Sequence, residues 1–451
     1  MLRITIPRVV GVLTLVLMVT YTFVLAPKLA GARADREPYA FAGSAPTAMP
    51  TWLVDALASP PATAPATGAA TTPGATETTP PAPKAAEKPQ APQFPPAGGA
   101  FTGIMTKTGP YDLGPLDEFS SAVRHQPNVL EFSVGWWDRR FDRRVFDTVA
   151  ERGIMPMVAW EPWDYHKESK DDKLRGEQPE YALSAIIDGG FDDYIKAWAE
   201  GVKALGYPIA LRFAHEMNGY WYPWAEQANG NKKGQYVQAW RHVHDIFKQA
   251  GATRVAWVWS PNVDYENATD LNTLYPGDDY VDWVGLSGYY GTAGVEKYKS
   301  FDQIFEPTLK KLRDFTRKPV VITETGATDT SGLKAQWITE MFNQLPAHPD
   351  IIGVIWYEAR KEVDWRVTAS GAAAEAYAAG VSAPRYGAQW SVHSEPAVTV
   401  PPPPAPAPTP TPTPTPTSTS TPTPTGKPST SPTKKPTAPA TRPRSSPTTT
   451  G

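Results

Sequence analysis

The chain has 451 residues, of which 50 are proline and none is cysteine, and its formal net charge is −3. The absence of cysteine excludes disulfides, thiol catalysis and zinc–thiolate sites. The near-balanced charge argues against nucleic-acid binding, for which a basic excess is typical.

The N-terminal segment has the sequence features expected of an export signal. Arg3 and Arg8 precede an apolar run over residues 9–26, and Ala32-Arg33-Ala34 resembles a cleavage site with small residues. The run is also just long enough to cross a bilayer as a helix. Residues 1–34 are therefore either a cleaved signal peptide or an uncleaved anchor. Positive residues ahead of the run keep the N-terminus inside, so both interpretations predict a secreted or extracytoplasmic protein, in the second case held to a membrane.

Composition divides the rest of the chain into three parts. Residues 35–97 are rich in Pro, Ala and Thr, and residues 393–451 are almost entirely Pro, Thr, Ser and Ala. Neither part has enough large apolar side chains to offset the entropy of ordering a chain, so we expect disordered, extended segments. Residues 98–392 remain as one folded domain, of the size that an α/β barrel requires.

Within this domain, eight short runs rich in Val, Ile and aromatic residues follow one another. They are continuous rather than alternating, which is typical of parallel strands covered on both faces. The runs are Phe101–Thr106, Asn128–Val134, Ile154–Trp160, Ile209–Ala214, Arg254–Ser260, Val281–Ser287, Pro319–Thr323 and Gly353–Tyr357.

Helical patterns separate several of these runs. Apolar residues recur every three or four positions from Phe191 to Leu205 and from Tyr236 to Phe247, and Gly206 and Gly251 follow these two segments. Alternation of strand and helix through eight units predicts the α/β class and a single (β/α)₈ barrel.

Aromatic and acidic residues follow the predicted strands, at the barrel end where active sites lie. Aromatic faces stack on sugar rings, and carboxyl groups can act as acid, base or nucleophile. This rim predicts a carbohydrate site. Its candidate substrate-binding residues are Trp136, Trp160, Glu161, Arg212, His215, Trp221, Trp224, Tyr289 and Trp356.

Two glutamates stand out among these strand ends. Glu216 follows the fourth strand and Glu324 ends the seventh, so their side chains can face each other across the barrel mouth. A retaining glycosidase needs two carboxyl groups about 5–5.5 Å apart, one of them protonated near neutral pH. The alternative for either residue alone is a structural ion pair, for example with Arg212.

The strand-four stretch RFAHEMNG (residues 212–219) with WYPW (221–224), and the stretch ITETG (322–326), resemble glycoside hydrolase family 26. The resemblance covers about residues 98–390. It implies a retaining (β/α)₈ glycosidase in which Glu216 is the acid/base and Glu324 the nucleophile. It further implies that His215 positions the nucleophile or the sugar, that Tyr289 hydrogen-bonds the nucleophile, and that Trp356 forms the floor under the sugar at the cleavage point.

The substrate implied by the resemblance is a β-linked polysaccharide. In the family's mannanases the loop after the acid tends to read Trp-Phe-Trp-Trp, whereas Trp221-Tyr222-Pro223-Trp224 looks more like its mixed-linkage β-glucanases. Glu161-Pro162-Trp163 also stands where a histidine-containing mannan site is expected. β-1,4-Mannan and β-1,3-1,4-glucan therefore both remain open as substrates.

Two other functions on the same barrel also stay open, a cell-surface transglycosylase and a non-catalytic glycan-binding protein. We expect a monomer whose partner is the polysaccharide. The proposed chemistry requires neither a cofactor nor a metal. His242 and His244, two residues apart on a helix, point to different faces and are poorly placed to share an ion.

Overall fold

A computed structural model describes residues 92–399, apart from 139, 172–173, 292–296 and 362. The predictions for residues 1–34, for nearly all of the linker and for most of the tail therefore lie outside the described residues. Among the helices that are described, none combines the length and the apolar character needed to cross a membrane.

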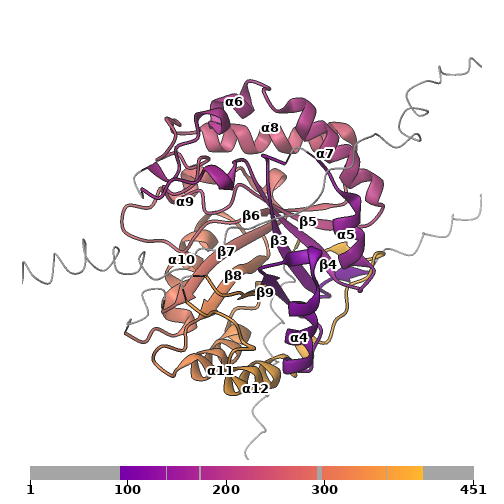
Figure 1. Cartoon of the computed structure of the whole chain (residues 1–451), viewed down its shortest axis with the longest axis vertical. Coiled ribbons are helices and arrows are strands. Elements are labelled where there is room, and N and C mark those ends of the chain that lie inside the picture. Colours follow the sequence, from indigo (N-terminus) through magenta and orange to yellow (C-terminus); the bar gives the residue numbers. More distant parts are fainter. Residues whose placement is uncertain (1–91, 139, 172–173, 292–296, 362, 400–451) are drawn as a thin grey trace, which may run out of the picture. The chain divides into compact units, whose positions relative to one another are not determined.

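Eight parallel strands form a closed barrel, in which each strand pairs with the next and the last pairs with the first. Figure 1 shows these strands at the centre of the domain with the helices around them. The predicted (β/α)₈ barrel is thus confirmed. The strands are β2 (Phe101–Thr106), β3 (Val129–Gly135), β4 (Met155–Glu161), β5 (Ile209–Phe213), β6 (Val255–Trp259), β7 (Trp283–Tyr290), β8 (Val320–Ala327) and β9 (Ile351–Glu358).

The barrel strands are buried on both faces, which explains their continuous apolar sequences. Every residue of β4, β5, β6 and β9 is buried. Inward side chains fill the barrel, while outward ones pack against the helices. The helices are α4 (Gly114–Val123), α5 (Arg143–Ala150), α6 (Leu183–Ile187), α7 (Asp192–Leu205), α8 (Gln235–Ala250), α9 (Leu271–Leu274), α10 (Phe301–Phe315), α11 (Lys334–Gln344) and α12 (Gly371–Val381).

The two helices expected from periodicity end where their glycines predict. Gly206 follows α7 and Gly251 follows α8, each with a φ of 77°. This left-handed conformation is open to glycine without strain, so each glycine stops its helix and turns the chain into the next strand. Helix α10 instead begins with a capping box, in which Ser300 and Gln303 satisfy each other's backbone N–H groups.

The folded domain extends beyond both of its predicted ends. Strand β1 (Gln93–Phe94) pairs in parallel with β10 (Glu395–Pro396), which joins the two ends of the described chain. Phe94 stacks on Phe101 at 5.5 Å between ring centroids, and Phe101 lies 5.6 Å from Trp283. The bounds of 98 and 392 were wrong by a few residues, because single apolar side chains within a proline-rich stretch suffice to anchor it.

Candidate active site

Arg212 is the centre of the polar network inside the barrel. It lies on β5 and is fully buried. Its Nε donates to Ser260 at 2.9 Å and its Nη2 to Ser287 at 2.6 Å. Its Nη1 donates to Glu131 at 2.8 Å and to Glu324 at 3.0 Å. Arg212 was predicted to bind substrate. In the structure it instead forms ion pairs with carboxyl groups inside the barrel, which is the structural alternative named above.

Glu324 points into the barrel because β8 carries an extra residue at this point. The register of β8 shifts by one residue against both β7 and β9 between Val321 and Thr325. Such a bulge re-aims a side chain, and bulges are common beside active sites. Glu324 accepts hydrogen bonds from Arg212 and from the Tyr289 hydroxyl. Its side chain keeps 18% of its surface exposed, so a substrate can reach this carboxylate.

Glu216 sits just beyond β5 in an unusual backbone conformation. Its φ is 53°, in the left-handed region that non-glycine residues rarely occupy, and its N–H donates to the Ser260 carbonyl at 2.6 Å. One carboxyl oxygen accepts from Asn262 at 2.8 Å and the other from the Trp221 indole at 3.0 Å. Strain held by surrounding contacts is frequent at functional sites, and here it aims the carboxyl group.

The two glutamates lie in opposite electrostatic environments. Burial, followed by the charge of Glu324, raises the pKa of Glu216, although Arg212, Asn262 and Trp221 oppose the shift. Glu324 instead forms an ion pair with Arg212. Retaining glycoside hydrolysis requires two carboxyl groups, of which one is protonated and acts as the acid while the other acts as the nucleophile.

His215 is buried against aromatic rings next to Glu216. Its imidazole centroid lies 5.0 Å from that of Tyr222 and 5.8 Å from that of Trp224. Burial, then the positive charges of Arg212 and Lys361, hold the pKa of His215 well below its ordinary value. Its Nδ1 has no hydrogen-bond partner within the described part of the chain. His215 is therefore a buried, neutral imidazole packed against the loop that carries Glu216.

Glu161 ends β4 and adds another carboxyl group to the barrel mouth. It accepts a hydrogen bond from the Trp163 indole at 2.8 Å, and burial raises its pKa, although Ser133 and Trp163 oppose the shift. Its position agrees with a binding residue at the rim.

Four tryptophans that we expected to bind substrate are fully buried: Trp136, Trp160, Trp224 and Trp356. Trp160 lies 4.9 Å from Trp198 of α7, and Trp136 lies 4.8 Å from Trp160 (ring centroids). Both pack between barrel and helices, so their assignment to substrate was wrong. Because side chains alternate along a strand, Trp160 faces outward where its neighbour Glu161 faces inward.

Trp356 also faces the helix layer rather than the barrel mouth. Its ring lies 6.0 Å from Trp337 of α11 and 6.0 Å from Tyr377 of α12. The next residue, Tyr357, points the other way, and its ring lies 6.2 Å from that of Tyr289. The aromatic side chain of β9 that lies beside Tyr289, the residue that donates to Glu324, is therefore Tyr357, one residue later than expected.

Trp224 packs beneath the loop that carries His215 and Glu216. Tyr222 stacks on it at 4.3 Å with an interplanar angle of 13°, and the Trp224 indole donates to the His215 carbonyl at 2.6 Å. Trp224 thus holds the loop that carries Glu216, while Trp221 and Tyr222 remain partly exposed above it. Trp221 keeps its predicted place in the mouth, in contact with Glu216 itself.

Sequence reasoning missed Trp137, which is 37% exposed beside the buried Trp136. Its ring meets His166 edge-on at 4.5 Å and Tyr165 at 5.7 Å. It also missed Trp365, 4.8 Å from Tyr289. Trp137 lies in the turn after β3 and Trp365 lies in a loop, so no periodic signal marks either residue.

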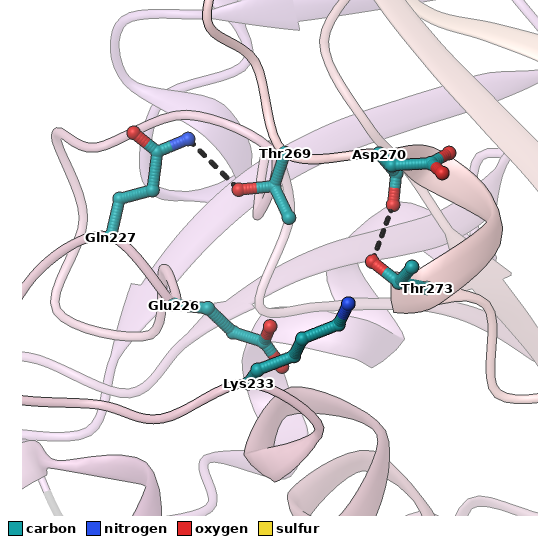
Figure 2. A pocket seen from close by; sticks show the side chains of 6 residues that line it. All are labelled: Glu226, Gln227, Lys233, Thr269, Asp270 and Thr273. Carbon is teal, nitrogen blue, oxygen red and sulfur yellow. Dashed lines mark hydrogen bonds between the residues drawn. The ribbon is translucent and has the colours of Figure 1, made fainter.

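A cavity of about 310 Å³ lies beside the loop that follows Trp224 (Figure 2). It shares no residue with the Arg212 network. Glu226, one of its lining residues, accepts the backbone N–H groups of Gly234 at 2.7 Å and Tyr236 at 3.2 Å, so this carboxylate holds the start of α8. The other lining residues are Gln227, Lys233, Thr269, Asp270 and Thr273.

A parallel barrel with this pair of glutamates has the architecture and the carboxyl groups of the barrel glycoside hydrolases. Comparison with known proteins agrees: residues 166–353, which contain both glutamates, match the model of Glycosyl hydrolase family 26. Over these residues the chain is similar to glycoside hydrolase family 26.

Two curated relatives give the range of similarity. The chain is 35% identical to Endoglucanase H of Acetivibrio thermocellus over 305 residues, which are 65% of this chain and 32% of that protein. It is 24% identical to a mannan endo-1,4-beta-mannosidase of Bacillus subtilis over 256 residues, 52% of this chain and 66% of the relative. The chain thus spans about a third of the first and just under two thirds of the second.

Among solved structures, a family 26 β-mannanase from Bacteroides ovatus aligns with a TM-score of 0.47 at 18% identity. The alignment covers 64% of this chain and 90% of that one.

Proposed function

We propose that this protein is a retaining endo-β-glycanase that hydrolyses a β-linked polysaccharide by double displacement. The observation that carries the proposal is the contrast between Glu216, whose environment favours the protonated form, and Glu324, which is paired with Arg212. The match of residues 166–353 to the family model and the two curated relatives, an endoglucanase and a mannosidase by name, support the same class of substrate.

The first step forms a covalent intermediate. A Glu324 oxygen attacks the anomeric carbon, the glycosidic C–O bond breaks, and the proton of Glu216 passes to the leaving oxygen. The Tyr289 hydroxyl and Arg212 both bind Glu324 and so fix the orientation of the attacking carboxylate.

Water completes the reaction in the second step. Glu216, now ionised, takes a proton from water, whose oxygen attacks the anomeric carbon and releases Glu324. Asn262 and Trp221 keep both oxygens of Glu216 in place while its role changes from acid to base.

The measurement that tests this mechanism is the anomeric configuration of the first product, followed by proton NMR during hydrolysis by the full-length protein. Double displacement gives the β-anomer first. An initial α-anomer would show a single displacement and would remove Glu324 from the role of nucleophile.

We propose a β-glucan with mixed linkages as the preferred substrate. Identity is higher to the endoglucanase than to the mannosidase, 35% over 305 residues against 24% over 256. The test is reducing-sugar release from barley β-glucan, glucomannan and galactomannan side by side. Preference for galactomannan would instead identify a mannanase. Transfer to an added acceptor oligosaccharide in place of hydrolysis would identify a transglycosylase, and binding without cleavage a glycan-binding protein.

We also propose that the protein is exported, because Arg3 and Arg8 precede the apolar run over residues 9–26. Fractionation of the host cells, followed by N-terminal sequencing of the product, distinguishes a cleaved signal from an anchor. Protein that remained in the cytoplasm would contradict export.

A further inference from the structure

Glu131 is a buried carboxyl group that the mechanism above does not use. It lies on β3 inside the barrel with none of its surface exposed. Its Oε1 accepts from Arg212 at 2.8 Å, whereas its Oε2 has no hydrogen-bond partner in the part of the chain that the structure describes. A buried carboxyl group left half-satisfied is costly, so its presence calls for a reason.

Glu131 and Glu324 share one cationic nitrogen. Nη1 of Arg212 donates to both carboxyl groups, at 2.8 Å and 3.0 Å. The charged groups that act on Glu131 are Arg212 on β5, Glu324 on β8 and Glu161 on β4. Burial raises the pKa of Glu131 to about 7 against the effect of Arg212, and the negative charge of Glu324 adds to the rise.

We propose that Glu131 is a second counter-ion for Arg212, which takes over when Glu324 loses its negative charge. The inference rests on the proposed function. In the covalent intermediate the attacking oxygen of Glu324 is bonded to the anomeric carbon, so Glu324 is a neutral ester. Arg212 is buried and cannot be discharged, and an unpaired buried cation is strongly unfavourable. Glu216 is ionised in the intermediate but acts on Arg212 only through its charge, because its oxygens accept from Asn262 and Trp221. Glu131 is the carboxyl group that is already hydrogen-bonded to Arg212.

The proton balance follows from the shared site. Above about pH 7 Glu131 is mostly ionised in the free enzyme, and it then faces Arg212 together with Glu324. Below that pH the proton of Glu131 passes to bulk water as Glu324 becomes an ester. It returns from bulk water when the second step restores the charge of Glu324. Glu131 is thus a positioning residue that acts through Arg212 and does not touch the substrate.

A double-mutant cycle tests the shared counter-ion without requiring any hydrolysis. Glu324→Gln puts a neutral group of the same shape where the ester forms. In the full-length protein at pH 8, Glu131→Gln and Glu324→Gln each leave Arg212 one carboxylate, so each alone is tolerated. The double variant leaves none, and its Tm should lie at least about 6 °C below the value that the two single changes give by addition.

A matched control cycle combines Glu324→Gln with Glu358→Gln instead of Glu131→Gln. Glu358 is also buried, but it accepts from Val367 and Thr368 rather than from Arg212. That cycle should be additive. If the cycle with Glu131 is additive as well, Arg212 does not depend on Glu131 and the inference is wrong, whether or not the protein proves to be a hydrolase.

Kinetics test whether the second counter-ion acts during turnover. Without Glu131 no carboxylate is hydrogen-bonded to Arg212 in the intermediate, so Glu131→Gln should lower kcat/KM about 10- to 100-fold. Breakdown of the intermediate restores the charge of Glu324, so kcat should not fall on a dinitrophenyl glycoside, for which the second step limits the rate. Glu131→Asp, which keeps a negative charge, should recover part of kcat/KM. An equal fall of both parameters, without recovery by Asp, would mean only structural damage.

Discussion

Replacing Trp356 with alanine tests whether this side chain packs against the helices or binds the sugar in the barrel mouth. The ring is fully buried between Trp337 and Tyr377, and its indole donates to the Trp365 carbonyl at 2.9 Å. Removing a buried tryptophan costs about 3–5 kcal/mol, to which an unsatisfied carbonyl adds about 1 kcal/mol or more. Unfolding entropy is about 2.1 cal/mol/K per residue, so in a domain of about 300 residues each kcal/mol lowers Tm by roughly 1.6 °C, and we expect a fall of roughly 6 °C or more.

The assay separates this role from a role in binding sugar. Thermal unfolding gives the Tm of the full-length variant, and steady-state kinetics well below that temperature give KM for the polysaccharide. We expect the lower Tm together with a KM within about twofold of the wild type, because the ring faces away from the substrate. Tyr357→Ala, one residue later, is the matched comparison and should raise KM. An unchanged Tm with a raised KM for Trp356→Ala would refute the placement and restore the sequence-based assignment.

Three further results are expected. Tyr289→Phe removes the hydroxyl that donates to Glu324 and should lower kcat/KM about 10- to 100-fold, measured on the preferred glycan; an unchanged value would remove Tyr289 from the site. Burial and Glu324 raise the pKa of Glu216, which must be protonated to act as the acid. The kcat/KM profile should therefore fall as pH rises through that pKa, above the ordinary carboxyl range; the absence of this fall on the alkaline side would contradict the assignment. Trp137→Ala should raise KM for long glycans but not for short aryl glycosides, and equal effects on both would argue against an outer sugar platform.

The sequence was sufficient to predict the barrel and the positions of its two glutamates. Continuous apolar runs predicted all eight strands, and Gly206 and Gly251 marked the ends of two helices, because these signals are local. Single residues such as Phe94 gave no comparable signal. It anchors the N-terminal end only through its stack on Phe101, a contact that becomes visible in three dimensions.

The direction of the rim side chains could not be predicted equally well. Trp136 and Trp137 lie in the turn after β3, where the alternation of a strand no longer fixes the direction of a side chain. Glu324 depends on a bulge in β8 that changes the alternation by one residue. The sequence around Glu131 does not distinguish it from other polar residues in strands. Its role depends on the hydrogen bond from Arg212 at 2.8 Å, which is seen only in the structure. These features all arise from pairing between strands.

The roles of the two glutamates are tested most directly by rescue with azide. On an activated β-glycoside, Glu324→Ala has lost the nucleophile, so azide should attack in its place and give the α-glycosyl azide. Glu216→Ala still forms the covalent intermediate, which azide should then open from the other face to give the β-glycosyl azide. Products of opposite configuration from the two variants are the predicted result. The same configuration from both variants, or the reverse assignment, would contradict the account.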